Sequence, residues 1–559
     1  MINLRYQLVA MVKNYTFYIW ALLLIGSVGV FAQNVQKDLN FEKIPEVTPK
    51  NVIFILTDDH RFDFMGFTGK VPWLETPNMD RLAREGAYFP NTFVTTSLCS
   101  PSRASILTGQ FSHTHTVVDN SAPAPESLIY FPEYLQKAGY ETSFFGKWHM
   151  GSNDDNPRPG FDHWESFLGQ GVYYNPTLNI NGERTRYGDS AYITDLLTEH
   201  AVKWLENRDM GKPFFMYLSH KAVHAEFAPA KRHLGTYENE KIILPPSFFT
   251  SAQPVRGKSN GYGLAEYPGT EEGKAVTEAG YPEGFLDNRR TEAGSFAEPA
   301  RNEDYYGKNR MPDWQKMQRE SWHGVDYMYH GSMDFATFYK RYCETLMAVD
   351  ESVGVLLDYL DRQGLAESTV IIYMGDNGFS FGEHGLIDKR QFYEESAKVP
   401  FLVRYPGVLE GNQVIEKMVQ NIDVAPTILE LAGVKEPPQM QGRSIVPILR
   451  GDYVEWRDRI FYEYYWENHF PQTPTMHGVR TDRYKLIRYH GIWDTNEFYD
   501  LKEDPHEMKN LIKSSEHREL IQQLTDEIYD WLESSGGMQI PLKRSGNRYG
   551  DHRNPGGFN

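Results

Sequence analysis

The strongest constraint on the fold is a set of short apolar runs between segments with helical periodicity. The runs lie at Asn51–Leu56, Glu141–Phe145, Pro213–Leu218 and Thr369–Met374. Continuous runs of this length, rich in β-branched and aromatic residues, are typical of strands buried on both faces of a parallel sheet. Helical patterns lie between them at Asn78–Glu85 and Phe338–Gln363. This alternation predicts an α/β fold with a mainly parallel central sheet flanked by helices.

Each apolar run is followed directly by polar side chains that suit metal or anion binding. The clusters are Asp58-Asp59-His60, Lys147-Trp148-His149, His220-Lys221 with His224, and Asp376-Asn377. Open α/β sheets bind their ligands beyond the carboxyl ends of the strands. A single polar cluster is ordinary loop chemistry, but four of the same character predict an active site at this edge of the sheet.

The chain divides into a larger α/β part and a smaller C-terminal part. We assign residues 50–435 to a catalytic α/β domain and residues 436–540 to a C-terminal α+β subdomain. In the subdomain we expect strands at Arg459–Tyr465 and Gly478–Arg488 and a helix near His517–Glu533. Residues 541–559 are rich in Gly, Asn and Arg and are expected to form a loose tail.

Residues 237–333 differ in composition from the rest of the catalytic part, because they are rich in Gly, Pro, Glu and aromatic residues and show weak periodicity. A structureless loop of this length is unusual inside a compact domain. We interpret the segment as an insertion over the active face, serving as a lid or a substrate wall. A surface excursion without a role is the alternative.

The N-terminus has the order of features found in a secretory signal peptide. Arg5 and Lys13 precede an apolar run at Phe17–Phe31, which closes on small residues before Gln33. We therefore expect residues 1–32 to be removed and the protein to be periplasmic or secreted. A retained membrane anchor is the alternative, since the run is near the short end of a spanning helix. After signal cleavage we expect no stable membrane span.

Composition narrows the possible functions. The chain has 57 Lys and Arg against 75 Asp and Glu, a formal net charge of −18, and no basic run that would bind nucleic acid. It has only two cysteines, which excludes a disulfide framework and a four-cysteine zinc site. Aromatic residues make up 14% of the chain, which suits either stacking on sugars or an aromatic-rich core.

The segment around Cys99 concentrates several chemical functions in one helical turn. Pro101 suits the first turn of a helix and Gly109 suits its C-terminal end, so Cys99 is expected at a helix N-terminus. Backbone N–H groups and the helix dipole favour anions at that end. Arg103 lies one turn further along the same face. The segment therefore predicts a reactive side chain beside an anion site, although a Cys at a helix start can also be merely buried.

The sequence Cys-Ser-Pro-Ser-Arg at 99–103, followed by Ala-Ser-Ile-Leu-Thr-Gly, resembles the signature of the type I, formylglycine-dependent sulfatases of the alkaline-phosphatase superfamily. The resemblance covers most of residues 50–515 apart from the insertion. It implies an alkaline-phosphatase-like fold, and it implies that a formylglycine-generating enzyme oxidises Cys99 to formylglycine. Further family-like blocks lie at Val52–Asp59, Phe145–Gly151, Phe215–His224, Met374–Lys389, Val399–Gly407, Asn421–Leu431 and Tyr484–Asp504.

The resemblance also implies a metal site. Asp58 and Asp59 match the acidic pair of the family, and Asp376 and Asn377 match its Asp-Asn pair. Together these four residues would bind one calcium ion. The residue types agree, since four hard oxygen donors suit Ca²⁺ rather than Zn²⁺.

The remaining residues carried over from the family are cationic or transfer protons. They are Arg103, Lys147, His149, His224 and Lys389. The mechanism implied is attack of a formylglycine-hydrate oxygen on the sulfur of a sulfate ester, with calcium, Arg103 and the lysines stabilising the sulfate charge. His224, aided by Lys389, would protonate the departing oxygen, and His149 or a carboxylate would help to expel sulfate. Val223 stands where the family often has Pro.

The sequence favours an exported sulfatase that acts on a sulfated polysaccharide or oligosaccharide. It most resembles bacterial polysaccharide sulfatases, and an algal polysaccharide such as ulvan or carrageenan is our first expectation. Substrate contacts are expected from His384, His477 and Arg480. A glycosaminoglycan or mucin sulfatase, a phosphonate monoester or phosphodiester hydrolase of the same superfamily, and a non-catalytic carbohydrate-binding protein are the alternatives. For His113 and His115 we favour packing or hydrogen bonding over metal binding.

Overall fold

The computed structural model describes residues 39–249 and 335–539, apart from 152–153, 189, 226, 468–469, 471 and 491–495, together with residues 314, 315, 318 and 324. The expected signal peptide at 1–32, the expected tail at 541–559 and most of the expected insertion at 237–333 lie outside the described residues. Within the described part of the chain, no helix combines the length and the apolar character needed to cross a bilayer.

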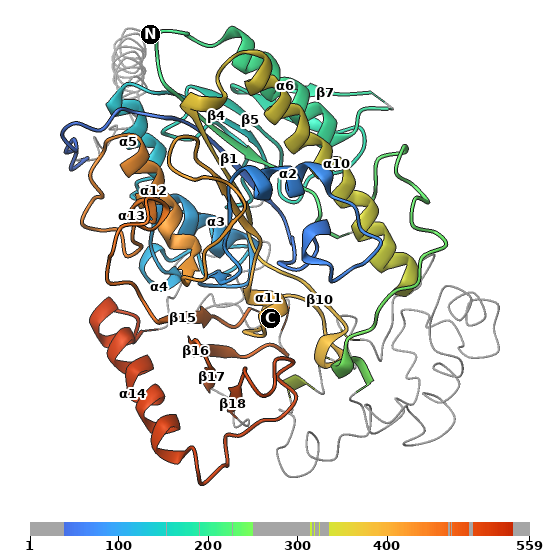
Figure 1. Cartoon of the computed structure of the whole chain (residues 1–559), viewed down its shortest axis with the longest axis vertical. Helices are drawn as coiled ribbons and strands as arrows, with labels where there is room; N and C mark the ends of the chain where they lie inside the picture. The colour runs from blue at the N-terminus through green and yellow to red at the C-terminus, as the bar shows by residue number, and fades with distance from the viewer. Residues whose placement is uncertain are drawn as a thin grey trace, which may run out of the picture. The chain divides into compact units, whose positions relative to one another are not determined.

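A ten-stranded sheet forms the centre of the described structure (Figure 1), in the order β13-β2-β12-β9-β1-β8-β4-β5-β6-β7. Strands β9, β1, β8, β4 and β5 are parallel, and β12 joins β9 in antiparallel register. The four predicted strands are β1, β4, β8 and β9, so the prediction of a mainly parallel sheet is confirmed. The strands are β1 (Asn51–Thr57), β2 (Ala87–Tyr88), β4 (Glu141–Gly146), β5 (His163–Ser166), β6 (Thr177–Ile180), β7 (Glu183–Arg186), β8 (Phe214–Ser219), β9 (Thr369–Gly375), β12 (Phe401–Arg404) and β13 (Gln413–Val414).

Helices cover both faces of this sheet, as the apolar runs predict. On one face, Ile53 and Ile55 share a buried core with residues of α2 (Pro77–Glu85), α6 (Ile193–Asn207) and α10 (Phe335–Arg362). On the other face, Phe131 of α5 (Phe131–Ala138) packs on Phe215 of β8, with ring centroids 5.2 Å apart. Helices α3 (Cys99–Thr108) and α12 (Val424–Leu431) pack beside α5. Each fully buried aliphatic side chain contributes about 2 kcal/mol to stability.

The C-terminal part is an antiparallel sheet covered by one long helix. Its strands follow one another as β15 (Arg459–Tyr464), β16 (Thr475–Thr481), β17 (Tyr484–His490) and β18 (Glu497–Asp500). Helix α14 (Arg518–Ser535) packs against it through Trp531, which stacks on Phe461 with centroids 4.9 Å apart. The single strand expected at Gly478–Arg488 is wrong, because the chain turns between β16 and β17. The Thr481 hydroxyl accepts the backbone N–H of Tyr484 and holds this turn closed.

Contacts join the C-terminal sheet to the loop that precedes α3. The hydroxyl of Tyr462 accepts the backbone N–H of Ser97 at 3.3 Å, and the N–H of Glu463 donates to the carbonyl of Thr95 at 2.9 Å. The C-terminal sheet therefore supports the start of the helix that carries Cys99. The remaining short elements are η1 (Gly66–Thr68), β3 (Thr92–Phe93), α4 (Ser112–His115), η2 (Pro246–Phe249), η5 (Ala366–Ser368), β10 (Ser380–Phe381), η6 (Glu383–Gly385), β11 (Ile387–Asp388), α11 (Glu394–Ala397), β14 (Val419–Gln420), η7 (Asn421–Asp423) and α13 (Val446–Leu449).

Candidate active site

The polar clusters predicted from the sequence meet at one edge of the central sheet. Strands β9, β1, β8 and β4 are neighbours and run in the same direction, so the residues after their carboxyl ends lie side by side. The backbone N–H of Asp59, after β1, donates to Asp376 Oδ1, after β9, at 3.0 Å. The backbone N–H of Asp58 donates to the carbonyl of Ala222, after β8, at 3.0 Å.

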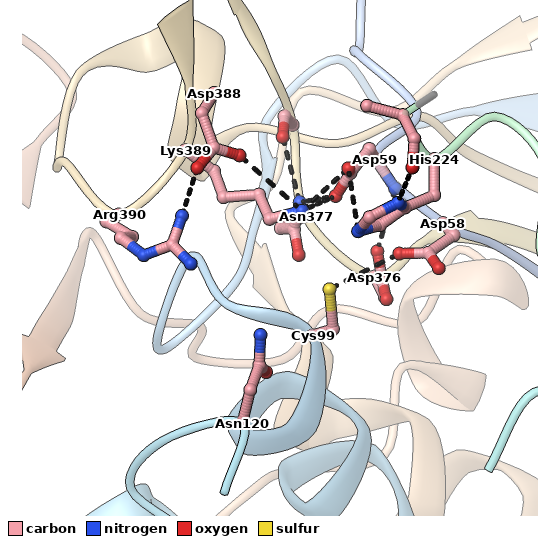
Figure 2. A network of polar contacts seen from close by, with 12 residues as sticks. Asp58, Asp59, Cys99, Asn120, His224, Asp376, Asn377, Asp388, Lys389 and Arg390 are labelled. Atoms are coloured by element: carbon pink, nitrogen blue, oxygen red, sulfur yellow. Dashed lines mark hydrogen bonds and ion pairs between the residues drawn. The ribbon is translucent and has the colours of Figure 1, made fainter. Parts of the chain in front are cut away.

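Three carboxylates form the centre of the site (Figure 2). Asp58, Asp59 and Asp376 are fully buried, and one oxygen from each lies within 4.8 Å of the others. Asn377 donates its amide N–H to Asp59 Oδ1 at 2.7 Å, while its own side-chain oxygen is buried without a hydrogen-bond partner. Buried carboxylates beside an unsatisfied amide oxygen are the donor set of a hard cation. These are the four residues predicted to bind metal.

Each carboxylate also has a close cationic partner. Lys147 forms an ion pair with Asp58, and Lys389 Nζ contacts both oxygens of Asp59 at 2.6 Å. Arg103 approaches Asp376 Oδ2 with Nε at 2.9 Å and Nη2 at 2.8 Å. Arg103 Nη1 donates further to the carbonyl of Lys147 at 2.6 Å and to Ser219 Oγ at 2.7 Å. A cation bound at the carboxylates would compete with these side chains for the same oxygens.

The three carboxyl groups differ in proton affinity. Burial opposes ionisation of Asp58, yet the neighbouring cationic groups, led by Lys147, together outweigh it and hold the pKa of Asp58 well below its usual range. Burial raises the pKa of Asp59 despite the nearby Lys389. Burial and the charge of Asp58 raise the pKa of Asp376 to about 7. The three carboxylates repel one another because they lie close together, so a bound cation would stabilise their ionised forms.

Cys99 lies at the start of α3, as predicted, and faces the carboxylates (Figure 2). It is completely buried, and its Sγ lies 3.4 Å from Asp58 Oδ1. The helix ends at Gly109, whose φ of 67° is the left-handed conformation that favours glycine. Burial and the charge of Asp58 raise the pKa of the Cys99 thiol well above its usual range. Because the thiolate is the reactive form, an unmodified thiol here is a poor nucleophile.

The two predicted histidines flank the site. His149 follows β4 and accepts the hydroxyl of Ser100 at its backbone carbonyl. His224 is partly exposed, and its Nε2 lies 3.8 Å from Asp59 Oδ2. Its Nδ1 contacts the carbonyl of Ala225, which makes Nδ1 the protonated nitrogen and directs Nε2 into the site. Burial and nearby lysines hold the pKa of both imidazoles well below their usual range, so both are neutral at pH 7 in the absence of substrate.

The predicted substrate residues lie outside this cluster of contacts. His384 is buried in η6, where it stacks on Tyr393 with centroids 4.0 Å apart. Arg480 forms an ion pair with Glu394 at 3.3 Å. His477 is buried in β16 beside Trp531 of α14, with centroids 6.1 Å apart. Their contact with substrate stays a prediction.

The pair His113 and His115 takes part in hydrogen bonding, as we favoured. His113 Nδ1 contacts Glu463 Oε2 at 2.8 Å, and His115 Nε2 contacts Ser105 Oγ at 3.0 Å. Neither histidine belongs to a group of described residues that could hold a metal ion.

The site also contains residues that we did not predict to act in it. Ser219 directly follows the apolar residues of β8 and begins a polar cluster, so a role in the site could have been predicted from its position. Lys221 lies in the same cluster. Gln170 was not detectable, because it lies in a loop without a motif and reaches Lys147 Nζ, at 2.5 Å from its Oε1, only in the folded chain.

Comparison with protein families gives two matches. The profile described as sulfatase matches residues 50–434. The profile described as N-sulphoglucosamine sulphohydrolase, C-terminal, matches residues 382–534. Together they span the central sheet, the site and the C-terminal sheet.

Among characterised proteins, an N-acetylglucosamine-6-O-sulfatase from Bacteroides thetaiotaomicron is 35% identical over 510 residues, which cover 86% of each chain. An ulvan-active sulfatase from Formosa agariphila is 24% identical over 502 residues, which cover 86% of this chain and 81% of the relative. Similarity is therefore greater to the hexosamine sulfatase than to the algal-polysaccharide enzyme.

Solved structures with the same fold are also similar to this chain. A structure in complex with its substrate D-glucosamine-2-N,6-O-disulfate has a TM-score of 0.71 and 32% identity, and the match covers 89% of this chain and all of the other. The phosphonate monoester hydrolase of Agrobacterium radiobacter has a TM-score of 0.61 at 19% identity, with 87% of this chain and 96% of the other covered. The second match is a likeness of fold alone.

Proposed function

Because this chain belongs to the sulfatase family, with an alkaline-phosphatase-like fold, and is a sulfuric ester hydrolase, we propose that it removes 6-O-sulfate from glucosamine-type residues of a sulfated glycan. The observation that carries the proposal is the position of Cys99. Its helix places it against Asp58, which belongs to a group of three buried carboxylates, each with a cationic partner. Since every position expected in the site is filled, a non-catalytic binding protein is not favoured.

We propose that Asp58, Asp59, Asp376 and Asn377 hold one Ca²⁺. The fit rests on oxygen donors alone, and on the side-chain oxygen of Asn377, which is buried without a partner. When bound, the ion supplies positive charge for the sulfate oxygens and takes over carboxylates that otherwise pair with lysines. Lys147 and Lys389 then keep their ammonium groups available for an anion.

We propose that a formylglycine-generating enzyme oxidises Cys99 to formylglycine, whose hydrate supplies the nucleophilic oxygen. The raised pKa of the thiol supports this, since an unmodified Cys99 would carry little thiolate. Ser100, next in the chain, donates to the carbonyl of His149 and so fixes the start of α3 against the loop after β4.

The cationic residues of the chain would bind and orient the sulfate ester. Arg103 is fixed by four hydrogen-bonding or ionic contacts, so its guanidinium changes little when charge develops on the substrate. Lys147 and Lys389 lie on either side of the carboxylates and would donate to sulfate oxygens. Fixed donors of this kind in a site without water are usually the largest contribution to catalysis.

His224 would deliver the proton to the departing alcohol oxygen. In the substrate-free site its imidazole is neutral, because burial and the charge of Lys389 disfavour a second proton. A bound sulfate ester brings negative charge, which raises the proton affinity of Nε2. His149, which follows the neighbouring strand β4, would take the proton of the remaining hydroxyl of the formylglycine hydrate when sulfate leaves.

The glucosamine-type substrate is favoured over the algal polysaccharide that we expected first. The relative with 35% identity is named for N-acetylglucosamine 6-O-sulfate, whereas the ulvan-active relative is 24% identical. Glycosaminoglycans, which we weighed as an alternative, contain this sugar ester. We propose that the enzyme works outside the cytoplasm after export, which agrees with an N-terminal segment of signal-peptide type.

The proposal is tested on protein produced together with a formylglycine-generating enzyme. The mass of the peptide that contains Cys99 should show the aldehyde or its hydrate, and N-acetylglucosamine 6-O-sulfate should release inorganic sulfate. Ulvan and carrageenan oligosaccharides and a phosphonate monoester serve as comparison substrates. Faster phosphonate cleavage than sulfate release by matured enzyme would refute the proposed substrate class.

A further inference from the structure

Lys221 is a fourth cation in the site, and it differs from the other three because no described residue gives it an anionic partner. It lies two residues after β8 and is buried, with 4% of its surface exposed. The three carboxylates of the centre pair with Lys147, Lys389 and Arg103, and Arg103 contacts two of them. In the described part of the chain, no carboxylate, carbonyl or hydroxyl lies within hydrogen-bond or ion-pair distance of the Lys221 ammonium.

The surroundings of Lys221 explain where its ammonium is held. It lies 4.7 Å from the ring centroid of Tyr173, a cation–π contact. The Tyr173 hydroxyl donates to the carbonyl of His224 at 2.6 Å, and the N–H of His224 donates to the carbonyl of Lys221 at 3.0 Å. Lys221 and His224 are therefore ends of one tight turn, fixed from outside by Tyr173.

The same loop that carries Tyr173 also carries Gln170, which contacts Lys147 at 2.5 Å. Burial lowers the pKa of Lys221 to about 8, and the charge of Lys147 adds to this effect, while Asp58 and Asp59 oppose it. Gln170, Tyr173, Lys147 and Lys221 thus form one wall beside the carboxylates. This wall presents two ammonium groups, whereas Lys389 contacts Asp59.

An ammonium that is buried without a counter-ion lowers the stability of a fold, and an anion from outside offsets that cost. We propose that Lys221 binds the sulfuryl group of the substrate, as an additional donor beside Lys147. This inference rests on the proposed sulfatase function and adds one residue to it. The ligand chemistry is a tetrahedral oxyanion, and inorganic sulfate shares it.

The test compares Lys221→Met, which keeps the aliphatic stem and removes the charge, with Lys221→Arg, which keeps the charge. Lys203→Met, an exposed lysine of α6, is the matched control. For the matured Lys221→Met enzyme, we expect the KM for N-acetylglucosamine 6-O-sulfate and the inhibition constant of inorganic sulfate to rise together, on the order of tenfold or more. Lys221→Arg should recover part of both, and Lys203→Met should change neither.

Thermal unfolding separates this role from a structural one. Without sulfate, Lys221→Met should melt no lower than wild type, because it removes a buried, unpaired charge. With sulfate, wild type should be stabilised more than the variant. A lower melting temperature of Lys221→Met, with an unchanged inhibition constant for sulfate, would show a packing residue and overturn the inference.

Two further outcomes are informative. If Lys221→Met raises KM but leaves the inhibition constant of sulfate unchanged, then Lys221 contacts another part of the sugar and its assignment to the sulfuryl group is wrong. If matured wild-type enzyme neither cleaves sulfate esters nor binds sulfate, then the proposed function itself fails. An active wild type with an unaltered variant refutes the role of Lys221 alone.

Discussion

At the scale of single residues, Cys99 combines complete burial with the contact that its chemistry needs. Its sulfur lies against Asp58, and its helix brings Arg103 to Asp376 one turn later. The signature around Cys99 made these positions predictable, because each motif residue has one role. The contact of Gln170 with Lys147 was not predictable, and neither was the lack of an anionic partner for Lys221 among the described residues. Both depend on which loops meet in the folded chain.

Replacement of Cys99 by Ser tests the role of this side chain. Cys99→Ser cannot form the hydrated aldehyde, so a sulfated intermediate would have no second hydroxyl with which to expel sulfate. We expect turnover to fall by at least about a thousandfold, with an unchanged melting temperature, since the side chains are nearly isosteric. Sulfate release over many turnovers measures the effect, and sustained release by the variant would contradict the mechanism.

Removal of calcium is the second test at this scale. Ca²⁺ at about a hundred times its dissociation constant should raise the free energy of unfolding by about 2.7 kcal/mol. Asp59→Asn removes one ligand and should abolish most of this increase, together with the activity. Thermal melts with chelator and with added Ca²⁺ measure both. Equal stabilisation of wild type and variant would place the ion elsewhere.

At the scale of elements, the helices and strands that carry the site lie close to where the pattern of apolar residues predicts them. Residues at alternate positions of β1 pack on opposite faces, which is why a continuous apolar run marked it. The turn between β16 and β17 was missed, because apolar residues continue on both sides of Asp482 and Arg483. Here hydrogen bonding by Thr481 outweighs the apolar pattern.

The N-terminus of α2 gives a pH-dependent prediction. Asp350 of α10 accepts the backbone N–H groups of Asn78 and Met79 at 3.0 and 2.8 Å, yet burial raises its pKa to about 6. The carboxyl group of Asp350 loses its proton near pH 4 in the unfolded chain, whereas in the folded chain it keeps the proton until about pH 6. The free energy of unfolding should therefore fall as the pH rises between these two values, and Asp350 should contribute up to about 3 kcal/mol to this fall.

Asp350→Asn should remove that part of the pH dependence. Urea unfolding of wild type and variant from pH 4 to pH 7 measures it. Asp358→Asn, at a more exposed position of the same helix, is the control. A wild type that becomes relatively more stable than Asp350→Asn as the pH rises would show the opposite sign and contradict the prediction.

At the scale of the whole molecule, buried ion pairs join α11, which precedes strand β12 of the central sheet, to the C-terminal sheet. Glu394 of α11 pairs with Lys485 of β17 at 2.8 Å and with Arg480 of β16 at 3.3 Å. The fold class could be predicted from strand and helix order alone. The support of the Cys99 loop by Tyr462 could not, because it joins positions more than 360 residues apart in the chain.

These shared contacts predict one cooperative unfolding transition. Glu394→Gln removes the carboxylate that Arg480 and Lys485 share, leaves Lys485 with Glu507 alone, and should lower the free energy of unfolding by about 3 kcal/mol. Lys435→Gln, which breaks an exposed pair with Glu42, should cost less than about 1 kcal/mol. Calorimetry measures both. Two separate heat-absorption peaks in wild type would show that the sheets unfold independently.

The complete burial of α3 also fixes an order of events in the life of the protein. Every residue from Cys99 to Thr108 is buried, so a second enzyme cannot bind this segment once the chain has folded. The partners that bury it include residues as late as Tyr462, which are synthesised long after Cys99. The proposed oxidation of Cys99 would therefore take place before the chain has folded, and the time that folding takes would set the fraction of molecules that become active.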